Sequence, residues 1–162
     1  QSAAMFDFEG AYFRLQATKP LTLAYALMDS PVGVCAWIVE KFKTWSHLDG
    51  ENIESAYTKD QLLTNVMIYL VTNTFATSTW MYRGLMEDPG GAPIAPGARI
   101  EKPVAVANFP HDFIGWPPRS MVERAMNGAR WTDMGEGGHF AALERPDKFV
   151  DDVRAFAREI GY

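Results

Sequence analysis

The sequence has 162 residues, 48% of them hydrophobic, which is enough to bury the core of one globular unit. With 15 Lys and Arg against 20 Asp and Glu, its formal net charge is -5, which argues against binding to nucleic acid or to an anionic membrane. The single cysteine, Cys35, rules out an internal disulfide and a cysteine-based zinc cage, and it fits a cytoplasmic protein.

The first half of the chain is predicted to be helical, because apolar residues recur every three or four positions and helix breakers fall between the segments. One helix is expected to begin at Pro20 and a second at Pro31, since proline suits the first turn of a helix. The polar stretch 46–57 is expected to be a loop. Thr58 is then expected to cap one long helix that continues to about Leu85.

A run rich in proline and glycine at 86–102 separates this helical region, residues 1–85, from the rest of the chain. Beyond it the pattern predicts a strand at 104–107, a helix at 118–126, a strand at 130–134 and an amphipathic helix at 146–160. Such an alternation with short connections is typical of a parallel sheet covered by helices. Two strands are too few for such a sheet, so residues 103–162 are expected to form the closing edge of a larger α/β sheet.

His139 points most clearly to chemistry, because it stands on a glycine-rich loop directly after a predicted strand. Asp112 follows the preceding strand in the same way, so parallel strands would bring both side chains to one edge of the sheet. A carboxylate that accepts a hydrogen bond from one imidazole nitrogen fixes the tautomer and leaves the other nitrogen free to act as a base. Taken alone, His139 would more often be simply a hydrogen-bonded loop histidine, and Asp112 a turn or cap residue.

A nucleophile on a tight turn of the form Gly-x-Nu-x-Gly should precede these two residues, and the sequence contains no such turn. Cys35 falls on the apolar stripe of a predicted helix and is expected to be packed and inert. Gly135 and Gly137 fail as a dinucleotide fingerprint because Phe140 occupies the third glycine position. The three histidines have no metal-ligand spacing, so neither a metal nor another cofactor is expected.

Four stretches of the sequence carry a resemblance to a known family. They are 11–20 (AYFRLQATKP), 26–42 with DSPVG at 29–33, 62–65 (LLTN) and 137–146 (GGHFAALERP). Together they resemble the carboxyl-terminal part of the microsomal-type epoxide hydrolases, which are α/β-hydrolases with a helical lid. The resemblance implies that residues 1–85 form most of the lid, 86–102 the connection, and 103–162 the last strands and helices of the catalytic core.

In that family a carboxylate nucleophile opens the epoxide to a covalent ester, which water then hydrolyses to a vicinal diol. The resemblance implies that Tyr12 and Tyr82 hold the epoxide oxygen and protonate it, while Asp112 supports His139 as the base that activates water. A phenol suits this task because it is protonated at neutral pH yet readily gives its proton to a basic alkoxide. Without the resemblance, each tyrosine would be expected simply to pack on an amphipathic helix.

The family's nucleophilic aspartate and its His-Gly-x-Pro oxyanion loop should both precede this sequence and are absent from it. Gly115-Trp116-Pro117 looks like that loop, but it follows the acid position and has Ile114 where histidine belongs. The expected partners are therefore a small-molecule epoxide, water and an N-terminal fragment of the same enzyme, with activity only in its presence. No nucleic-acid partner is expected, and a homodimer is compatible with the sequence.

Two other functions fit part of this pattern. Another lidded α/β-hydrolase, such as an ester hydrolase or a haloalkane dehalogenase, would also use Asp112 and His139. An ester hydrolase, however, stabilises its oxyanion with backbone N–H groups and does not need Tyr12 and Tyr82. A non-catalytic binding protein that kept the fold is the third reading, and the identity of the nucleophile distinguishes the three.

Overall fold

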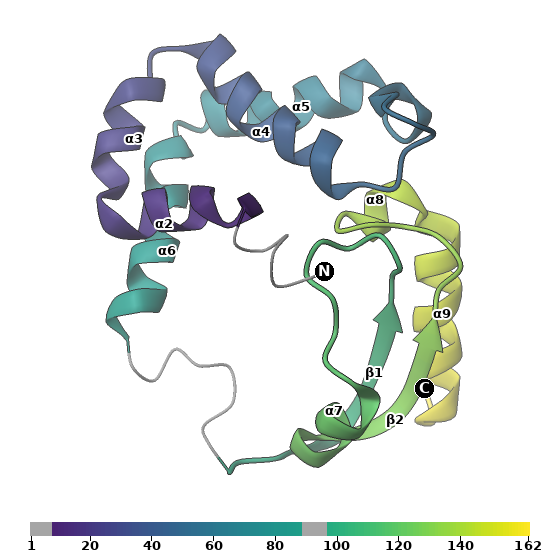
Figure 1. Ribbon diagram of the computed structural model, residues 1–162. Helices are drawn as coiled ribbons and strands as arrows, with labels where there is room; N and C mark the ends of the chain where they lie inside the picture. The colour runs from purple at the N-terminus through teal and green to yellow at the C-terminus, as the bar shows by residue number, and fades with distance from the viewer. Residues whose placement is uncertain (1–7, 89–96) are drawn as a thin grey trace.

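The structure is a computed structural model that describes residues 8–88 and 97–162. Figure 1 shows a helical region built from the first part of the chain and a sheet region built from the second. The helical region contains α2 (Ala11–Thr18), α3 (Pro20–Leu27), α4 (Pro31–Trp45), the short 3-10 helix η1 (Ile53–Ser55), α5 (Lys59–Val71) and α6 (Phe75–Glu87). The sheet region contains β1 (Ile100–Asn108), α7 (Arg119–Ala125), β2 (Met126–Asp133), α8 (Ala141–Glu144) and α9 (Pro146–Glu159). Residues 89–96 of the connection expected at 86–102 lie outside the described residues.

Three helices begin where the sequence predicts. Pro20 and Pro31 stand at the first positions of α3 and α4, where a missing N–H costs no hydrogen bond. Thr58 and Gln61 cap α5 reciprocally, because the Thr58 hydroxyl accepts from the Gln61 N–H and the Gln61 side chain accepts from the Thr58 N–H. Local sequence signals therefore determine where these helices start.

The prediction of one helix from Thr58 to about Leu85 is wrong, because the chain breaks into α5 and α6. Asn73 adopts a left-handed backbone conformation with φ of 54°, which asparagine tolerates better than most residues. The Thr74 N–H then donates to the Tyr69 carbonyl at 3.0 Å and closes the end of α5. The break lets α6 turn back against α2 and α3 instead of extending α5 (Figure 1).

The two predicted strands are confirmed as parallel neighbours, and both begin earlier than predicted. Their pairing runs from Ile100 opposite Met126 to Asn108 opposite Asp133. The predicted helices at 118–126 and 146–160 are confirmed as α7 and α9, each to within one residue at either end. Since the strands are parallel, the loops that follow them leave the sheet at the same edge, and the Asn108 side chain donates to Asp133 there at 2.9 Å.

Helix α9 lies beside β2 (Figure 1), and polar side-chain contacts join the two. The Asp152 carboxylate accepts from Arg130 at 2.9 Å and from the Thr132 hydroxyl at 2.7 Å, and its side chain is almost fully buried. A carboxylate in such a position needs these partners, because an unpaired buried charge is costly. The contacts fix α9 along the strand that leads to the His139 loop.

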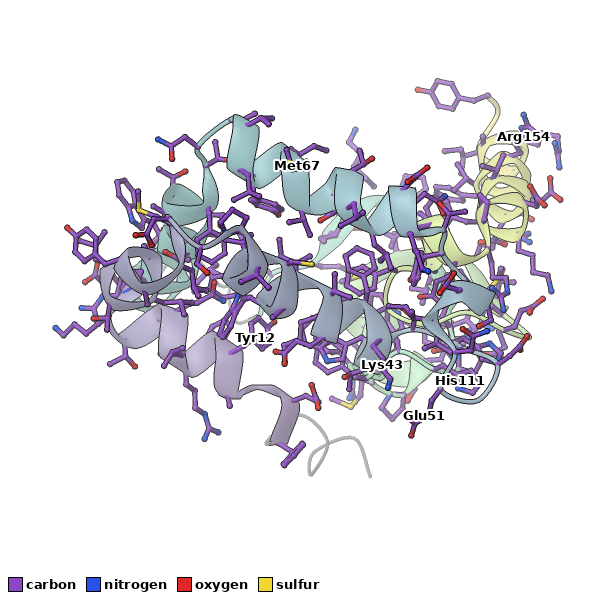
Figure 2. All side chains as sticks on the ribbon, turned by 90° about the horizontal axis from the view of Figure 1, so that it is seen from above. Tyr12, Lys43, Glu51, Met67, His111 and Arg154 are labelled. Atoms are coloured by element: carbon purple, nitrogen blue, oxygen red, sulfur yellow. The ribbon has the colours of Figure 1, made fainter. Side chains whose placement is uncertain are left out.

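Aromatic packing joins the helical region to the sheet region. Phe140, from the loop after β2, stacks on Phe42 of α4 at 4.3 Å between ring centroids. Trp45, the last residue of α4, stacks in the same way on Phe113 of the loop after β1 at 4.2 Å. Seen from above, this end of α4, marked by Lys43, lies next to the loop that carries His111 (Figure 2).

Among the described residues, no helix is long and apolar enough to cross a membrane.

Candidate active site

His139 and Asp112 lie side by side on the loops that follow β2 and β1, as the sequence predicts for the ends of parallel strands. The Nδ1 atom of His139 is 3.0 Å from the Oδ1 atom of Asp112. The same carboxylate oxygen accepts from the Ile114 N–H at 3.0 Å, which fixes the carboxylate within its own loop. With Nδ1 bound to Asp112, Nε2 is the imidazole nitrogen left to exchange a proton with a substrate or water.

Backbone hydrogen bonds tie the two loops together. The Met134 N–H donates to the Asn108 carbonyl at 2.9 Å, directly beyond the strands. Farther along, the His111 N–H donates to the Gly137 carbonyl at 3.1 Å. The separation between His139 and Asp112 is therefore determined by main-chain contacts as well as by their own hydrogen bond.

An aromatic wall surrounds the His139 ring, which is 33% exposed. Trp45, Phe113 and Phe140 all meet it edge to face, with ring centroids between 4.9 Å and 5.3 Å away. The backbone N–H of His139 also donates to the Trp45 carbonyl at 2.8 Å. Such packing restricts the imidazole to one orientation, which a general base requires.

Tyr12 of α2 and Tyr82 of α6 form the second predicted pair. Their rings meet edge to face with centroids 5.7 Å apart, and Tyr12 also packs against Trp45 at 5.1 Å. Burial, together with the adjacent Tyr82 phenol, raises the pKa of Tyr12 to about 12. The Tyr12 phenol thus keeps its proton throughout the physiological range.

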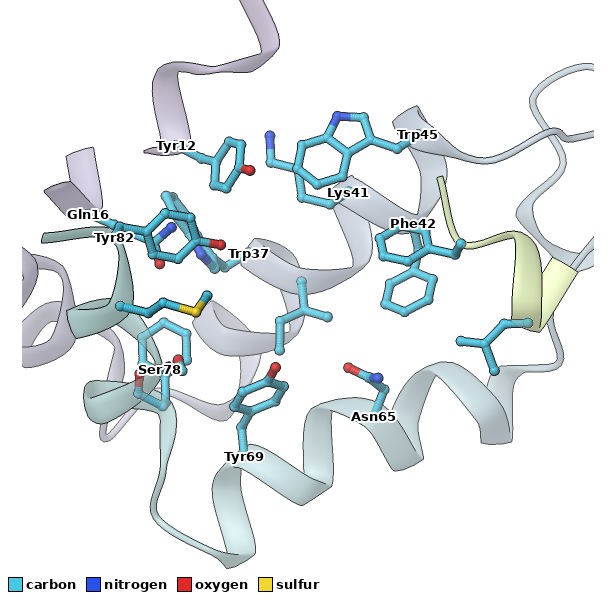
Figure 3. A pocket seen from close by; sticks show the side chains of 15 residues that line it. Tyr12, Gln16, Trp37, Lys41, Phe42, Trp45, Asn65, Tyr69, Ser78 and Tyr82 are labelled. Atoms are coloured by element: carbon cyan, nitrogen blue, oxygen red, sulfur yellow. Dashed lines mark hydrogen bonds between the residues drawn. The ribbon is translucent and has the colours of Figure 1, made fainter. Parts of the chain in front are cut away.

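The two tyrosines line a cavity of about 320 Å³ between the helices (Figure 3). Their phenol rings lie on one side of the cavity, and Tyr69 and Asn65 of α5 lie across from them. The wall is mostly apolar and includes Trp37, Ile38, Phe42, Trp45, Phe75, Met81, Phe140 and Leu143. An apolar cavity with a few directed polar groups is typical of a small-molecule site.

The four predicted residues do not all line this one cavity. His139 and Asp112 line an adjacent hollow of about 360 Å³, which shares Phe140 and Leu143 with the tyrosine cavity. Trp45 connects the two pairs, because its ring contacts both Tyr12 and His139. The tyrosine pair and the histidine pair therefore line neighbouring hollows and share Trp45 as a contact.

Three further residues shape the site without having been singled out from the sequence. Trp45 forms the shared wall, and Lys41 lies over the rings of both Tyr12 and Trp45 at 5.4 Å and 5.2 Å. The buried Glu144 carboxylate binds backbone N–H groups on either side of His139. Lys41 and Glu144 belong to stretches that carried the resemblance, at 26–42 and 137–146, whereas Trp45 lies outside them.

In the part of the chain that the structure describes, no group of three or more His, Cys, Asp and Glu side chains is arranged to hold a metal ion. Cys35, on α4, is partly buried beside the helical core formed by Val34, Val66 and Phe75. This position agrees with its expected packing role.

The chain is similar to known proteins over almost its whole length. No family model matches the chain. It is 37% identical over 159 residues to a putative epoxide hydrolase of Stigmatella aurantiaca, covering 98% of this chain and 35% of that protein. It is 33% identical over 153 residues to epoxide hydrolase 1 of Sus scrofa, covering 91% of this chain and 34% of that protein. The chain thus spans about a third of the length of the curated relatives it matches.

Solved structures give the same result for the fold. The juvenile hormone epoxide hydrolase of the silkworm Bombyx mori matches 98% of this chain and 38% of its own with a TM-score of 0.88 and 28% identity. An enantioselective mutant of the epoxide hydrolase of Aspergillus niger matches 98% of this chain and 39% of its own with a TM-score of 0.79 and 31% identity. Sequence and fold agree over almost the whole chain, which therefore belongs to the epoxide hydrolases of the α/β-hydrolase fold.

Proposed function

We propose that the whole protein to which this chain belongs hydrolyses an epoxide to a vicinal diol through a covalent ester. In this proposal residues 1–85 are most of a lid over the site, 86–102 the connection, and 103–162 the end of the catalytic core. The observation that carries the proposal is the packing of Trp45 between the Tyr12 and Tyr82 pair and the His139 and Asp112 pair. Two phenols that can donate a proton, and a histidine with its carboxylate that can accept one, match a reaction with two successive proton transfers.

The first step opens the epoxide ring. A carboxylate from outside this chain attacks one ring carbon and forms an ester bond, and the bond from that carbon to the epoxide oxygen breaks. Tyr12 or Tyr82 donates its phenolic proton to the departing oxygen, so that an alcohol forms instead of a free alkoxide. The raised pKa of Tyr12 suits this role, because the acid must be protonated before the step begins.

The second step releases the diol. His139 takes a proton from water through Nε2, and the water oxygen attacks the ester carbonyl. The tetrahedral intermediate then breaks its bond to the alcohol oxygen, which receives the proton from His139. The carboxylic acid that remains loses its proton, which reprotonates the tyrosinate left by the first step, so the nucleophilic carboxylate and both phenols are regenerated. Asp112, bound to Nδ1 at 3.0 Å, stabilises the imidazolium that exists between these events.

The tyrosine pair favours an epoxide over an ester or a haloalkane as substrate. An ester hydrolase gains its oxyanion stabilisation from backbone N–H groups, and its leaving group takes a proton from the histidine. In a dehalogenation the leaving halide needs no proton. Two phenols packed edge to face at 5.7 Å fit a reaction in which an oxygen leaves a carbon and must be protonated beside the cavity.

Product formation in the complete protein is the direct test. A panel of terminal and internal epoxides is incubated with the complete protein, and diols are measured by gas chromatography. One turnover in water enriched in heavy oxygen should yield a diol carrying ordinary oxygen, because the attacking oxygen comes from the protein carboxylate. Direct transfer of heavy oxygen into the first diol would contradict the ester, and binding without diol formation would favour a non-catalytic protein.

A further inference from the structure

The carboxylate of Glu144, at the end of α8, is 5% exposed and joins two distant parts of the chain. Its Oε2 atom accepts from the His47 N–H and from the Gly138 N–H, each at 2.8 Å. Its Oε1 atom accepts from the Phe140 N–H at 2.9 Å. Charge-assisted hydrogen bonds of this kind are stronger than neutral ones and offset the cost of burying the charge. We call Glu144 and these three N–H groups the clasp.

The two segments joined by the clasp are in direct backbone contact. A Cβ atom added to Gly138 would lie 2.5 Å from the Trp45 carbonyl oxygen and 2.9 Å from the His47 nitrogen. Only glycine fits at such a close approach of two backbones. A second hydrogen bond reinforces the contact, because His47 Nδ1 accepts from the Gly137 N–H at 3.1 Å.

The clasp holds the backbone on both sides of His139. Gly138 precedes His139 and Phe140 follows it, so the Glu144 carboxylate fixes the peptide units from which the imidazole extends. The same carboxylate ties them to the end of α4, whose Trp45 packs against the His139 ring. Displacement of a reacting group by about 1 Å costs on the order of a hundredfold in rate.

We propose that Glu144 is a positioning residue for ester hydrolysis, which acts by holding His139 at the distance and angle required to activate water. The proposal rests on the function proposed above. It assigns Glu144 to the second step alone, because the clasp contacts the two neighbours of His139 and makes no contact with Tyr12 or Tyr82 among the described hydrogen bonds. Loss of the carboxylate should therefore separate the two half-reactions.

Glu144→Gln in the complete protein tests this separation. A glutamine can present its oxygen to the His47 and Gly138 N–H groups, but its NH₂ group then faces the Phe140 N–H, so at least one hydrogen bond is lost. We expect single-turnover ester hydrolysis to slow by about tenfold to a hundredfold, with ester formation unchanged within about twofold. Both rates are measured by rapid mixing, acid quenching and mass spectrometry of the intact protein.

Glu136→Gln is the matched control, because it makes the same chemical change on the loop that carries His139. Glu136 accepts from Arg145 at 2.8 Å and from Lys148 and binds neither neighbour of His139. We expect both half-reactions to keep the parent rates. Equal loss of both half-reactions in Glu144→Gln, or hydrolysis at the parent rate, would overturn the proposal.

Two further measurements keep the test decisive. Glu144→Asp keeps the charge and shortens the side chain by one methylene. It should slow ester hydrolysis less than Glu144→Gln does and leave ester formation unchanged. It replaces Glu144→Gln in the test if that variant does not fold. Amide hydrogen exchange is independent of activity and should be faster at 45–48 and 137–140 in Glu144→Gln than in Glu136→Gln. A parent protein that forms no diol contradicts the proposed function, whereas unchanged exchange in a folded Glu144 variant contradicts the clasp.

Discussion

The two pairs of candidate residues are held in different ways. His139 and Asp112 extend from loops laced together by backbone hydrogen bonds and share a direct bond of 3.0 Å. Tyr12 and Tyr82 extend from α2 and α6 and are located by ring packing at 5.7 Å. The main-chain contacts closely fix the direction in which the His139 imidazole points, as the activation of water by a base requires. Ring packing keeps the two phenols close to each other, which suffices for two acids that donate to the same oxygen.

The two pairs should respond differently to substitution. The pair of His139 and Asp112 contains one general base and one supporting carboxylate, so its members are not interchangeable. The acid pair contains two phenols of the same chemistry, so one can partly replace the other.

His139→Gln should have the largest effect, because it removes the base. We expect steady-state diol formation by the complete protein to fall by about 10⁴-fold. The control is His111→Gln, which changes a histidine of the neighbouring loop whose ring stacks on His47 at 3.8 Å. It should keep the parent turnover, and normal turnover in His139→Gln would remove His139 from the reaction.

The Tyr12→Phe and Tyr82→Phe double variant should come next. Loss of both acids should slow ester formation by about 10³-fold, while each single variant loses much less because the other phenol remains. Single-turnover rates of ester formation are the measurement. Tyr25→Phe, which changes an exposed tyrosine of α3, is the control and should react at the parent rate. Parent rates in the double variant would indicate that both tyrosines are structural.

Asp112→Asn should have a smaller effect than His139→Gln, because the imidazole remains and loses only its charged support. We expect ester hydrolysis to slow by about 10²-fold with ester formation unchanged. The control is Asp133→Asn, at the end of β2, where the carboxylate binds Asn108 and Trp131 instead of His139. An unchanged rate of hydrolysis in Asp112→Asn would leave Asp112 without a role in positioning His139.

Alkaline pH should produce the smallest effect, a change in the stability of the folded protein. The pKa of Tyr12 is raised from 10.0 to about 12, so the folded protein holds this proton more tightly than the unfolded chain does. The resulting stabilisation is present below pH 10 and is lost as the pH rises from 10 to about 12. Ultraviolet titration of tyrosinate, parent minus Tyr12→Phe, should show this late ionisation. Ionisation near pH 10 would show that the Tyr12 phenol is ordinarily solvated.

Helix starts, strand direction and the contact between His139 and Asp112 followed from local sequence signals. Proline, a capping box and two strand-end loops each determine structure over a few residues, so no distant contact was needed to predict them. The break at Asn73 was missed because asparagine tolerates a helix interior as well as a helix end, and the choice depends on whether α6 can pack against α2 and α3. Tertiary packing decided that point.

Trp45 and Glu144 could not have been assigned from spacing alone. Trp45 precedes His139 by more than ninety positions and meets it only because α4 ends against the loop after β2. Glu144 stands in the motif of His139, yet its role depends on His47, which comes from the helical region. Contacts between the two regions arise from the fold and have no local sequence signal.

The difference between the two pairs is tested most directly by measuring the ester itself. The complete His139→Gln protein and the complete Tyr12→Phe and Tyr82→Phe double variant are mixed with the same epoxide, and their intact masses are followed over time. We expect the histidine variant to gain the mass of one substrate and to keep it, and the tyrosine variant to remain unmodified during the same period. Ester accumulation in the tyrosine variant, or none in the histidine variant, would contradict the division of the reaction between the two pairs.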